Sequence, residues 1–236
     1  IVAAALANHG ALRDDIDLLV TRILHPQYAT GIPQFWADWR VAPQIKFDIV
    51  WGWDRFAEGG AKPNADDNTS YGHNVEFAWL LLHAADILGQ DRTSYADVVR
   101  PIFDHCVMYG IDPEYGGVFT EGPDDAPPTL TEKQFWQQAE VLIGMLDACL
   151  LFGDEKYWQA FRNVYDFVFG KMVVMEAGGE WYERLDRFGT PIDPILGHAW
   201  KINYHTVRSM VQSIERLKAL DARAAGLNHH RPRAAR

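Results

Sequence analysis

The stretch KQFWQQAEVLIGMLDACLLFGDEK, residues 133–156, decides the fold class of this chain. Its first twenty residues carry a helical apolar pattern, and Gly153 follows them as a plausible C-cap. Asp154 and Glu155 then lead into another helical pattern, at residues 156–174. The stretch therefore predicts two antiparallel helices joined by a short turn.

The same pattern recurs along the rest of the chain. Further helices are predicted at residues 1–7, 12–24, 74–88, 95–109 and 204–220. Short aromatic-rich extended pieces are predicted between them, at residues 34–39, 47–51, 117–120 and 180–185. Stacked helix pairs with short β pieces in the loops indicate a helical toroid or a solenoid, and periodicity alone does not choose between the two.

Bulk composition excludes some classes of protein. The 236 residues are 48% hydrophobic and carry a formal net charge of −10, which argues against a nucleic-acid-binding surface. Because no apolar run approaches the roughly 20 residues of a membrane span, no membrane association is predicted. Cys106 and Cys149 lie in apolar helical patterns, so we expect buried thiols and a cytoplasmic location.

The two ends of the chain lead to separate expectations. Ile1 opens an apolar helical pattern without an initiator Met, which predicts a truncated start and leaves an upstream signal peptide open. Residues 226–236 are polar and basic and are expected to form a flexible tail. Metal binding by His229 and His230 is disfavoured, because no other ligand cluster accompanies them. The prediction is a single domain over residues 1–225.

The first candidate site residue is His73, in the stretch SYGHNVEFAWLLL at residues 70–82. Ser70 or Thr69 can cap the helix, which puts His73 at its first turn and Glu76 on the same face. The positive end of a helix dipole favours a neutral imidazole, the form that a general base needs. The alternative is a capping histidine beside a solvated glutamate.

A second candidate group follows in WKINYHTVR, residues 200–208, where His205 and Arg208 are three residues apart and Trp200 precedes them. An acid–base group, a cation and an aromatic plate suit a sugar, whose C–H face stacks on aromatic rings. A third group is Trp136 and Glu140, on one helix face. For both groups a purely structural role remains the alternative.

Four segments, taken in order, resemble one family. SYGHNVEFAWLLL (70–82), FWQQAE (135–140), GDEKY (153–157) and WKINYHTVR (200–208) are similar to the C-terminal signatures of the N-acylglucosamine and cellobiose 2-epimerase superfamily. The resemblance implies an all-α (α/α)6 barrel, twelve helices in two rings. About seven helices are predicted here, so the barrel is expected to be incomplete at its N-terminus.

The resemblance also implies roles for individual residues. His73 and His205 would be the acid–base pair, Glu76 would assist His73, and Trp136, Trp200 and Arg208 would bind the sugar. Neither a metal nor another cofactor is implied. Phe135 stands where the family has the first tryptophan of a pair, which weakens the expected recognition of a second sugar ring.

The predicted activity is C2 epimerisation of a reducing-end aldose, most like that of the cellobiose 2-epimerases, through deprotonation and reprotonation by way of an enediol. N-acylglucosamine 2-epimerisation and aldose–ketose isomerisation of mannose or glucose are the neighbouring alternatives. Two other classes stay open, a non-catalytic interaction protein and a glycoside hydrolase or lyase. A hydrolase would require two facing carboxylates roughly 5–10 Å apart. The predicted partner is a small sugar, and a homodimer is compatible with the sequence.

Overall fold

The computed structural model describes residues 69–123, 126–193, 196–197, 201 and 203–226. The elements predicted at residues 1–7, 12–24, 34–39 and 47–51 lie outside these ranges, as do Trp200 and the tail at residues 227–236.

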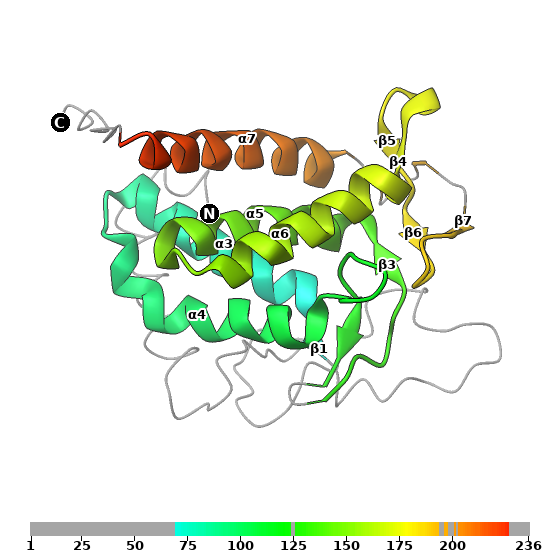
Figure 1. Ribbon diagram of the computed structural model, residues 1–236, viewed down its shortest axis with the longest axis horizontal. Coiled ribbons are helices and arrows are strands. Elements are labelled where there is room, and N and C mark those ends of the chain that lie inside the picture. Colours follow the sequence, from blue (N-terminus) through cyan, green and yellow to red (C-terminus); the bar gives the residue numbers. More distant parts are fainter. Residues whose placement is uncertain (1–68, 124–125, 194–195, 198–200, 202, 227–236) are drawn as a thin grey trace.

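The described part is mostly helical. Its α-helices are α3 (Tyr71–Leu88), α4 (Ala96–His105), α5 (Phe135–Phe152), α6 (Glu155–Phe167) and α7 (Tyr204–Ala224). They lie roughly along one another, with the short strands gathered at one end of the bundle (Figure 1). Helices α3, α5 and α7 begin at that end, so their first turns come together there.

Four predicted helices are present with changed bounds. α3 begins at Tyr71 because Ser70 caps it, and α7 continues to Ala224. The helix predicted at residues 133–152 begins only at Phe135, since the two residues before it pair as a strand. The helix predicted at residues 156–174 gives way to a π-turn, Val168–Met172, and then to a strand.

The helix predicted at residues 95–109 is instead three segments: a 3₁₀ turn (Arg92–Tyr95), α4 and a π-turn (Cys106–Gly110). The π-turn closes when the Ile111 N–H donates to the Cys106 carbonyl at 2.9 Å. This wider turn directs Ile111 into an antiparallel bridge with Val118. The helical run therefore ends at Gly110, close to its predicted end, but its last turn is wider than an α-helical one.

The strands are short and antiparallel. β1 (Thr69–Ser70) pairs with β2 (Glu121–Gly122), β3 (Lys133–Gln134) with β6 (Arg184–Leu185), β6 with β7 (Pro191–Asp193), and β4 (Val173–Val174) with β5 (Glu180–Trp181). The extended piece predicted at residues 180–185 is thus two strands in different sheets, and that at 117–120 contributes only the bridge at Val118. β1 and β3 run directly into α3 and α5, which fixes where these helices begin.

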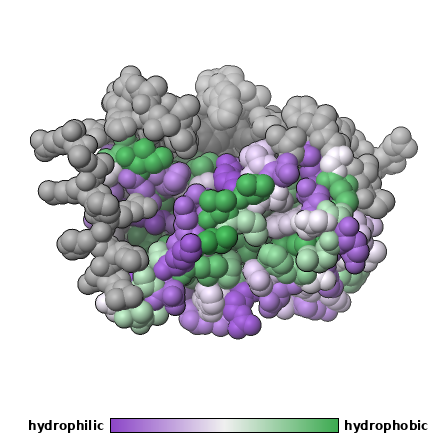
Figure 2. All heavy atoms as spheres, turned by 90° about the horizontal axis from the view of Figure 1, so that it is seen from above, coloured by the Kyte–Doolittle hydropathy of each residue, from purple (hydrophilic) through white to green (hydrophobic). Residues whose placement is uncertain are grey.

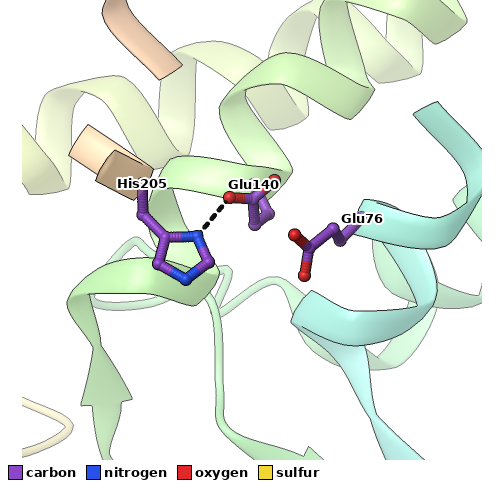
Figure 3. Close-up of side chains that lie close together, drawn as sticks. All are labelled: Glu76, Glu140 and His205. Atoms are coloured by element: carbon purple, nitrogen blue, oxygen red, sulfur yellow. Dashed lines mark hydrogen bonds and ion pairs between the residues drawn. The ribbon is translucent and has the colours of Figure 1, made fainter. Parts of the chain in front are cut away.

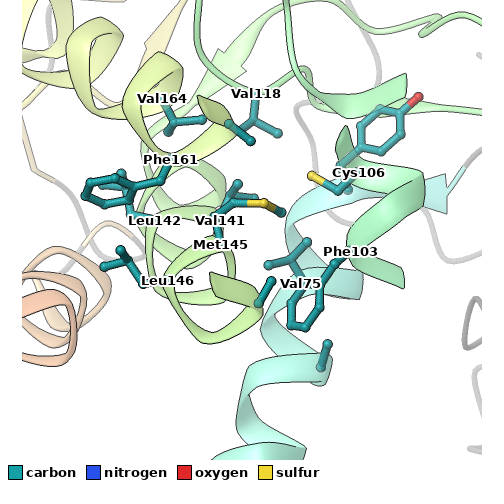
Figure 4. Packing of buried hydrophobic residues seen from close by; sticks show 14 of the residues in the cluster. Val75, Phe103, Cys106, Val118, Val141, Leu142, Met145, Leu146, Phe161 and Val164 are labelled. Atoms are coloured by element: carbon teal, nitrogen blue, oxygen red, sulfur yellow. The ribbon is translucent and has the colours of Figure 1, made fainter. Parts of the chain in front are cut away.

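Helix α5 lies at the centre and is buried along nearly its whole length. Leu142 and Leu146 lie on the side of α5 near Phe161 of α6, whereas the Met145 sulfur points toward Cys106 (Figure 4). Each such buried side chain contributes about 1.5–3 kcal/mol relative to leaving it exposed. The cysteines are free and buried, as predicted, and burial raises the pKa of the Cys106 thiol to about 12.

Among the described residues α5 has the length and composition of a membrane-crossing helix, so the expectation that no run approaches that length was wrong. Its 18-residue window has a mean hydropathy of 1.2, and 78% of it is buried inside the structure. A core helix covered by neighbours on every side is apolar for the same reason as a membrane helix. Burial by α3, α6 and α7 therefore accounts for its composition.

Helix α7 has an inverted amphipathic pattern. Its outer side exposes Tyr204, Val207, Val211 and Ile214, and the surface above it shows hydrophobic patches (Figure 2). Its buried side chains are mostly polar, and partly buried Met210, Leu217 and Leu220 pack beside them on the core. The buried residues are Thr206, Ser209, Ser213, Arg216 and Ala222. Hydrogen bonds and ion pairs consequently hold much of α7 against α5, among them Ser209 Oγ to the Ala139 carbonyl at 2.7 Å.

Candidate functional site

The first turn of α3 fixes the position of His73. The Ser70 hydroxyl accepts the His73 backbone N–H at 3.4 Å and lies 2.9 Å from His73 Nδ1. The neighbouring N–H, that of Gly72, donates to Gln137 Oε1 at 2.9 Å. A Cβ at Gly72 would lie 2.5 Å from Gln137 Cγ, so only glycine allows α5 to approach this turn so closely. Ser70 is the cap that the sequence predicted.

Trp136, on the first turn of α5, lies close to both candidate histidines. Its ring centroid is 4.4 Å from that of His73 and 5.7 Å from that of His205. The indole Nε1 donates to Gln134 Oε1 at 2.7 Å, which holds the ring in place. Two imidazoles that are 132 positions apart in sequence, on α3 and α7, therefore approach the same indole.

His205 is held by a buried carboxylate. Its Nδ1 lies 2.5 Å from Glu140 Oε1, and the Glu140 side chain is fully buried (Figure 3). The Tyr204 ring, 3.9 Å away between centroids, and the Phe135 ring, at 6.1 Å, cover further sides of the imidazole. A carboxylate on Nδ1 orients the ring and leaves Nε2 for proton transfer.

Arg208 joins the two carboxylates of the site. Its Nη2 lies 2.6 Å from Glu76 Oε1 and 2.6 Å from Glu140 Oε1. Burial and the charge of Glu140 raise the pKa of the Glu76 carboxyl, while Arg208 opposes that rise. Glu76 is thus bound in an ion pair and is not the solvated glutamate of the structural alternative.

Glu76, Glu140 and His205 offer donor atoms within 4.8 Å of one another, a grouping that could hold a metal ion (Figure 3). The Arg208 guanidinium already supplies positive charge to both carboxylates.

Five of the six predicted site residues come together here: His73, Glu76, Trp136, His205 and Arg208. The sixth, Trp200, lies outside the described residues. Phe135 is only 5% exposed, with the Lys201 ammonium 4.7 Å from its ring centroid. Its ring packs within the protein, and the weakened recognition of a second sugar ring stays a prediction.

The sequence grouped Glu140 with Trp136 but gave it no role in the site, whereas in the structure it contacts both His205 and Arg208. The sequence did contain a signal. In a helix that is apolar on every side, a carboxylate must be buried, and a buried carboxylate needs cationic or hydrogen-bonding partners. Trp79 is a second residue of the site that the sequence did not indicate, and its indole Nε1 donates to Glu140 Oε2 at 2.8 Å.

The fold and site define a helical protein with two imidazoles, one held by a buried carboxylate, around an aromatic ring. A sequence model of one family, described as N-acylglucosamine 2-epimerase (GlcNAc 2-epimerase), matches residues 13–209. The chain belongs to this family, whose members are carbohydrate epimerases and isomerases.

Several characterised relatives are similar in sequence. A cellobiose 2-epimerase of Eubacterium cellulosolvens is 31% identical over 149 residues, which are 63% of this chain and 36% of that protein. A D-mannose isomerase of Marinomonas mediterranea is 28% identical over 153 residues, 62% of this chain and 36% of that protein. The chain thus spans little more than a third of the length of these relatives.

Solved structures share the helical fold. The cellobiose 2-epimerase from Bacillus thermoamylovorans aligns with a TM-score of 0.66 and 26% identity, over 88% of this chain and 47% of that one. A D-mannose isomerase aligns with a TM-score of 0.69 and 22% identity, over 89% and 51%.

Proposed function

We propose that this protein is a sugar 2-epimerase, cellobiose 2-epimerase-like, that inverts C2 at the reducing end of a neutral aldose. The observation that carries the proposal is that His73 and His205 both lie close to Trp136, with His205 held by buried Glu140. Similarity to cellobiose 2-epimerases supports the substrate class. The described helices would be part of an (α/α)6 barrel, as the resemblance implies.

Inversion at C2 needs a proton to leave one face of the carbon and another to arrive at the opposite face. Two imidazoles from different helices meet this requirement when the sugar lies between them. In the proposed reaction the ring opens, one histidine removes the C2 proton to give an enediol, and the other delivers a proton to the opposite face. Each such positioned group contributes on the order of 10²–10⁴-fold.

The other residues of the site would support these steps. Glu140 would orient His205 and stabilise its imidazolium while the ring carries the extra proton. Arg208 would stabilise negative charge on the enediol oxygens, since its guanidinium lies beside His205, with Nη2 3.4 Å from Nδ1. Trp136 would stack on the apolar face of the sugar.

The test is incubation of the purified protein with cellobiose, mannose, glucose and N-acetylglucosamine in D₂O, followed by chromatography and NMR. We expect deuterium at C2 together with the C2 epimer. His73→Ala and His205→Ala should each reduce product formation by at least about 10²-fold. Wild-type turnover in both variants would contradict the acid–base assignment.

Aldose–ketose isomerisation is the second candidate, favoured by the similarity to D-mannose isomerases. The same enediol gives a ketose when the proton is delivered to C1 instead of C2. If the protein forms fructose but no glucose from mannose, the activity is isomerisation and not epimerisation. The role proposed for the two histidines would be unchanged. Folded protein that forms no product from any of the four sugars would favour a non-catalytic role.

A further inference from the structure

A second ionic cluster lies on α5 two helical turns beyond Glu140. Asp147 is fully buried and forms ion pairs with two arginines, one on either side. Its Oδ2 lies 2.7 Å from Arg216 Nη2, and its Oδ1 pairs with Arg92. The Arg216 side chain, on α7, is only 8% exposed. Asp147 therefore ties α5 to α7 and to the turn that precedes α4.

Stability alone is a poor explanation for such a cluster. Taking charges out of water costs several kcal/mol per ion, and apolar residues of similar volume are often as good or better for folding. The side of α5 against α6 shows that this helix also packs with apolar residues. We therefore look for a role of these three charged side chains in fixing the positions of neighbouring groups.

Trp79 connects this cluster to the candidate site. Its indole, 1% exposed, has the Arg216 guanidinium 5.7 Å from the ring centroid and the Arg208 guanidinium at 5.1 Å. The same indole donates its N–H to Glu140 Oε2. Arg216 thus contacts the ring that holds one oxygen of Glu140, and Asp147 holds Arg216.

The Glu140 carboxylate needs such a constraint. Rotation about the terminal torsion of a glutamate is soft, so the carboxylate takes the orientation that its partners impose. Oε1 is shared by His205 and Arg208, whereas the bond described for Oε2 is the one from Trp79. A shift of the indole would turn the carboxylate and move His205 with it.

We propose that Asp147 and Arg216 are positioning residues of the site, which fix the Trp79 indole and, through Glu140, the orientation of the His205 imidazole. This inference rests on the proposed function, in which His205 transfers a proton. Neither residue touches the sugar, so their effect falls on the rate of the chemical step and not on substrate binding.

Asp147→Asn keeps the size of the side chain and removes its charge. We expect kcat for C2 deuterium exchange to fall on the order of 10- to 100-fold with little change in KM, because a reacting group displaced by a fraction of an ångström loses rate steeply. The pH–rate profile should shift as well. The matched control is Leu146→Ala, the neighbouring residue on the apolar side of α5, which destabilises the fold but should keep kcat and the pH profile below its unfolding transition.

Trp79→Phe keeps a ring between the two arginines and removes the N–H that holds Glu140. If both substitutions act through that bond, the double variant with Asp147→Asn should be little worse than the more impaired single variant. Independent losses that multiply would contradict the inference. If Asp147→Asn fails to fold, Arg216→Lys takes its place. This substitution keeps the charge beside Asp147 but removes the planar group over Trp79. A wild-type kcat in Arg216→Lys would overturn the proposal.

A measurement without turnover separates this inference from the proposed function. In protein labelled at histidine, the His205 imidazole resonance, assigned by its loss in His205→Ala, should move in Asp147→Asn and stay in place in Leu146→Ala. Absence of C2 exchange in the wild-type protein would refute the proposed function. The comparison of His205 resonances would still show whether Asp147 positions His205. An Asp147→Asn protein with an unmoved His205 resonance would overturn it.

Discussion

The two sides of helix α5 are built in opposite ways. Toward α6, residues such as Leu142 and Leu146 form an apolar interface (Figure 4). Toward α3 and α7, the same helix carries Glu140 and Asp147, both fully buried against arginines. Apolar contacts are non-directional and tolerate small shifts, whereas a buried ion pair is favourable only in good geometry. One side of α5 therefore stabilises the fold, and the other fixes the positions of individual side chains.

The largest effect is expected from removing the carboxylate of Glu140. Glu140→Ala leaves Arg208 and His205 beside a buried gap, which should cost about 3–5 kcal/mol of the free energy of unfolding. Product formation should fall as well, because His205 loses the group that orients it. Chemical denaturation and the C2 exchange assay measure the two losses. Glu140→Gln is the matched control, since it keeps the volume; if it retains full activity, the charge is unimportant.

On the apolar side, Leu142→Ala should lower the free energy of unfolding by about 2–5 kcal/mol, because it opens a cavity beneath α6. Leu142 is 1% exposed and belongs to the hydrophobic core. Activity per folded molecule should stay near that of the wild type. A large fall in kcat for folded Leu142→Ala would show that the two sides are not separable.

A third ionic cluster consists of Asp112, Lys133 and Arg187. It tests whether every buried ion pair of this protein affects the candidate site. Burial raises the pKa of the Asp112 carboxyl, but hydrogen bonds from Arg187 and Lys133 outweigh it and lower the pKa to about 2. Since the folded pKa is below the ordinary value, this stabilisation, about 2 kcal/mol, is present above about pH 4 and lost as the pH falls toward 2.

Asp112→Asn should therefore be less stable than the wild type at pH 7 and nearly equal to it near pH 2, as followed by urea denaturation at each pH. Its kcat should change far less than that of Asp147→Asn. An equal stability difference at both pH values would contradict the lowered pKa.

The smallest effect is expected at the turn after α5, which belongs to neither side. Gly153 has a φ of 72°, and a Cβ there would meet nothing within 4 Å. Gly153→Ala should cost about 1–2 kcal/mol, since an L-residue is strained in the left-handed region. Thermal unfolding measures the loss, and unchanged kcat would provide the baseline for the other variants.

Sequence alone located four of the described helices and indicated five residues that the structure brings together. Apolar periodicity located α3, α5, α6 and α7, because a helix that buries a face must repeat its apolar residues at helical spacing. The order of the four signature segments indicated His73 and His205, and the cap at Ser70 followed from the chemistry of a helix N-terminus.

Only the tertiary structure decided which groups act on one another. The partners of Glu140 lie 61 to 68 positions away, on α3 and α7, and no local pattern encodes such a pairing. The same holds for the strand at Lys133, where pairing with Leu185, 52 positions away, overrides helical propensity. Helix periodicity is a property of neighbouring residues, whereas an ion pair between helices depends on how the helices pack, and packing arises only when the whole core forms.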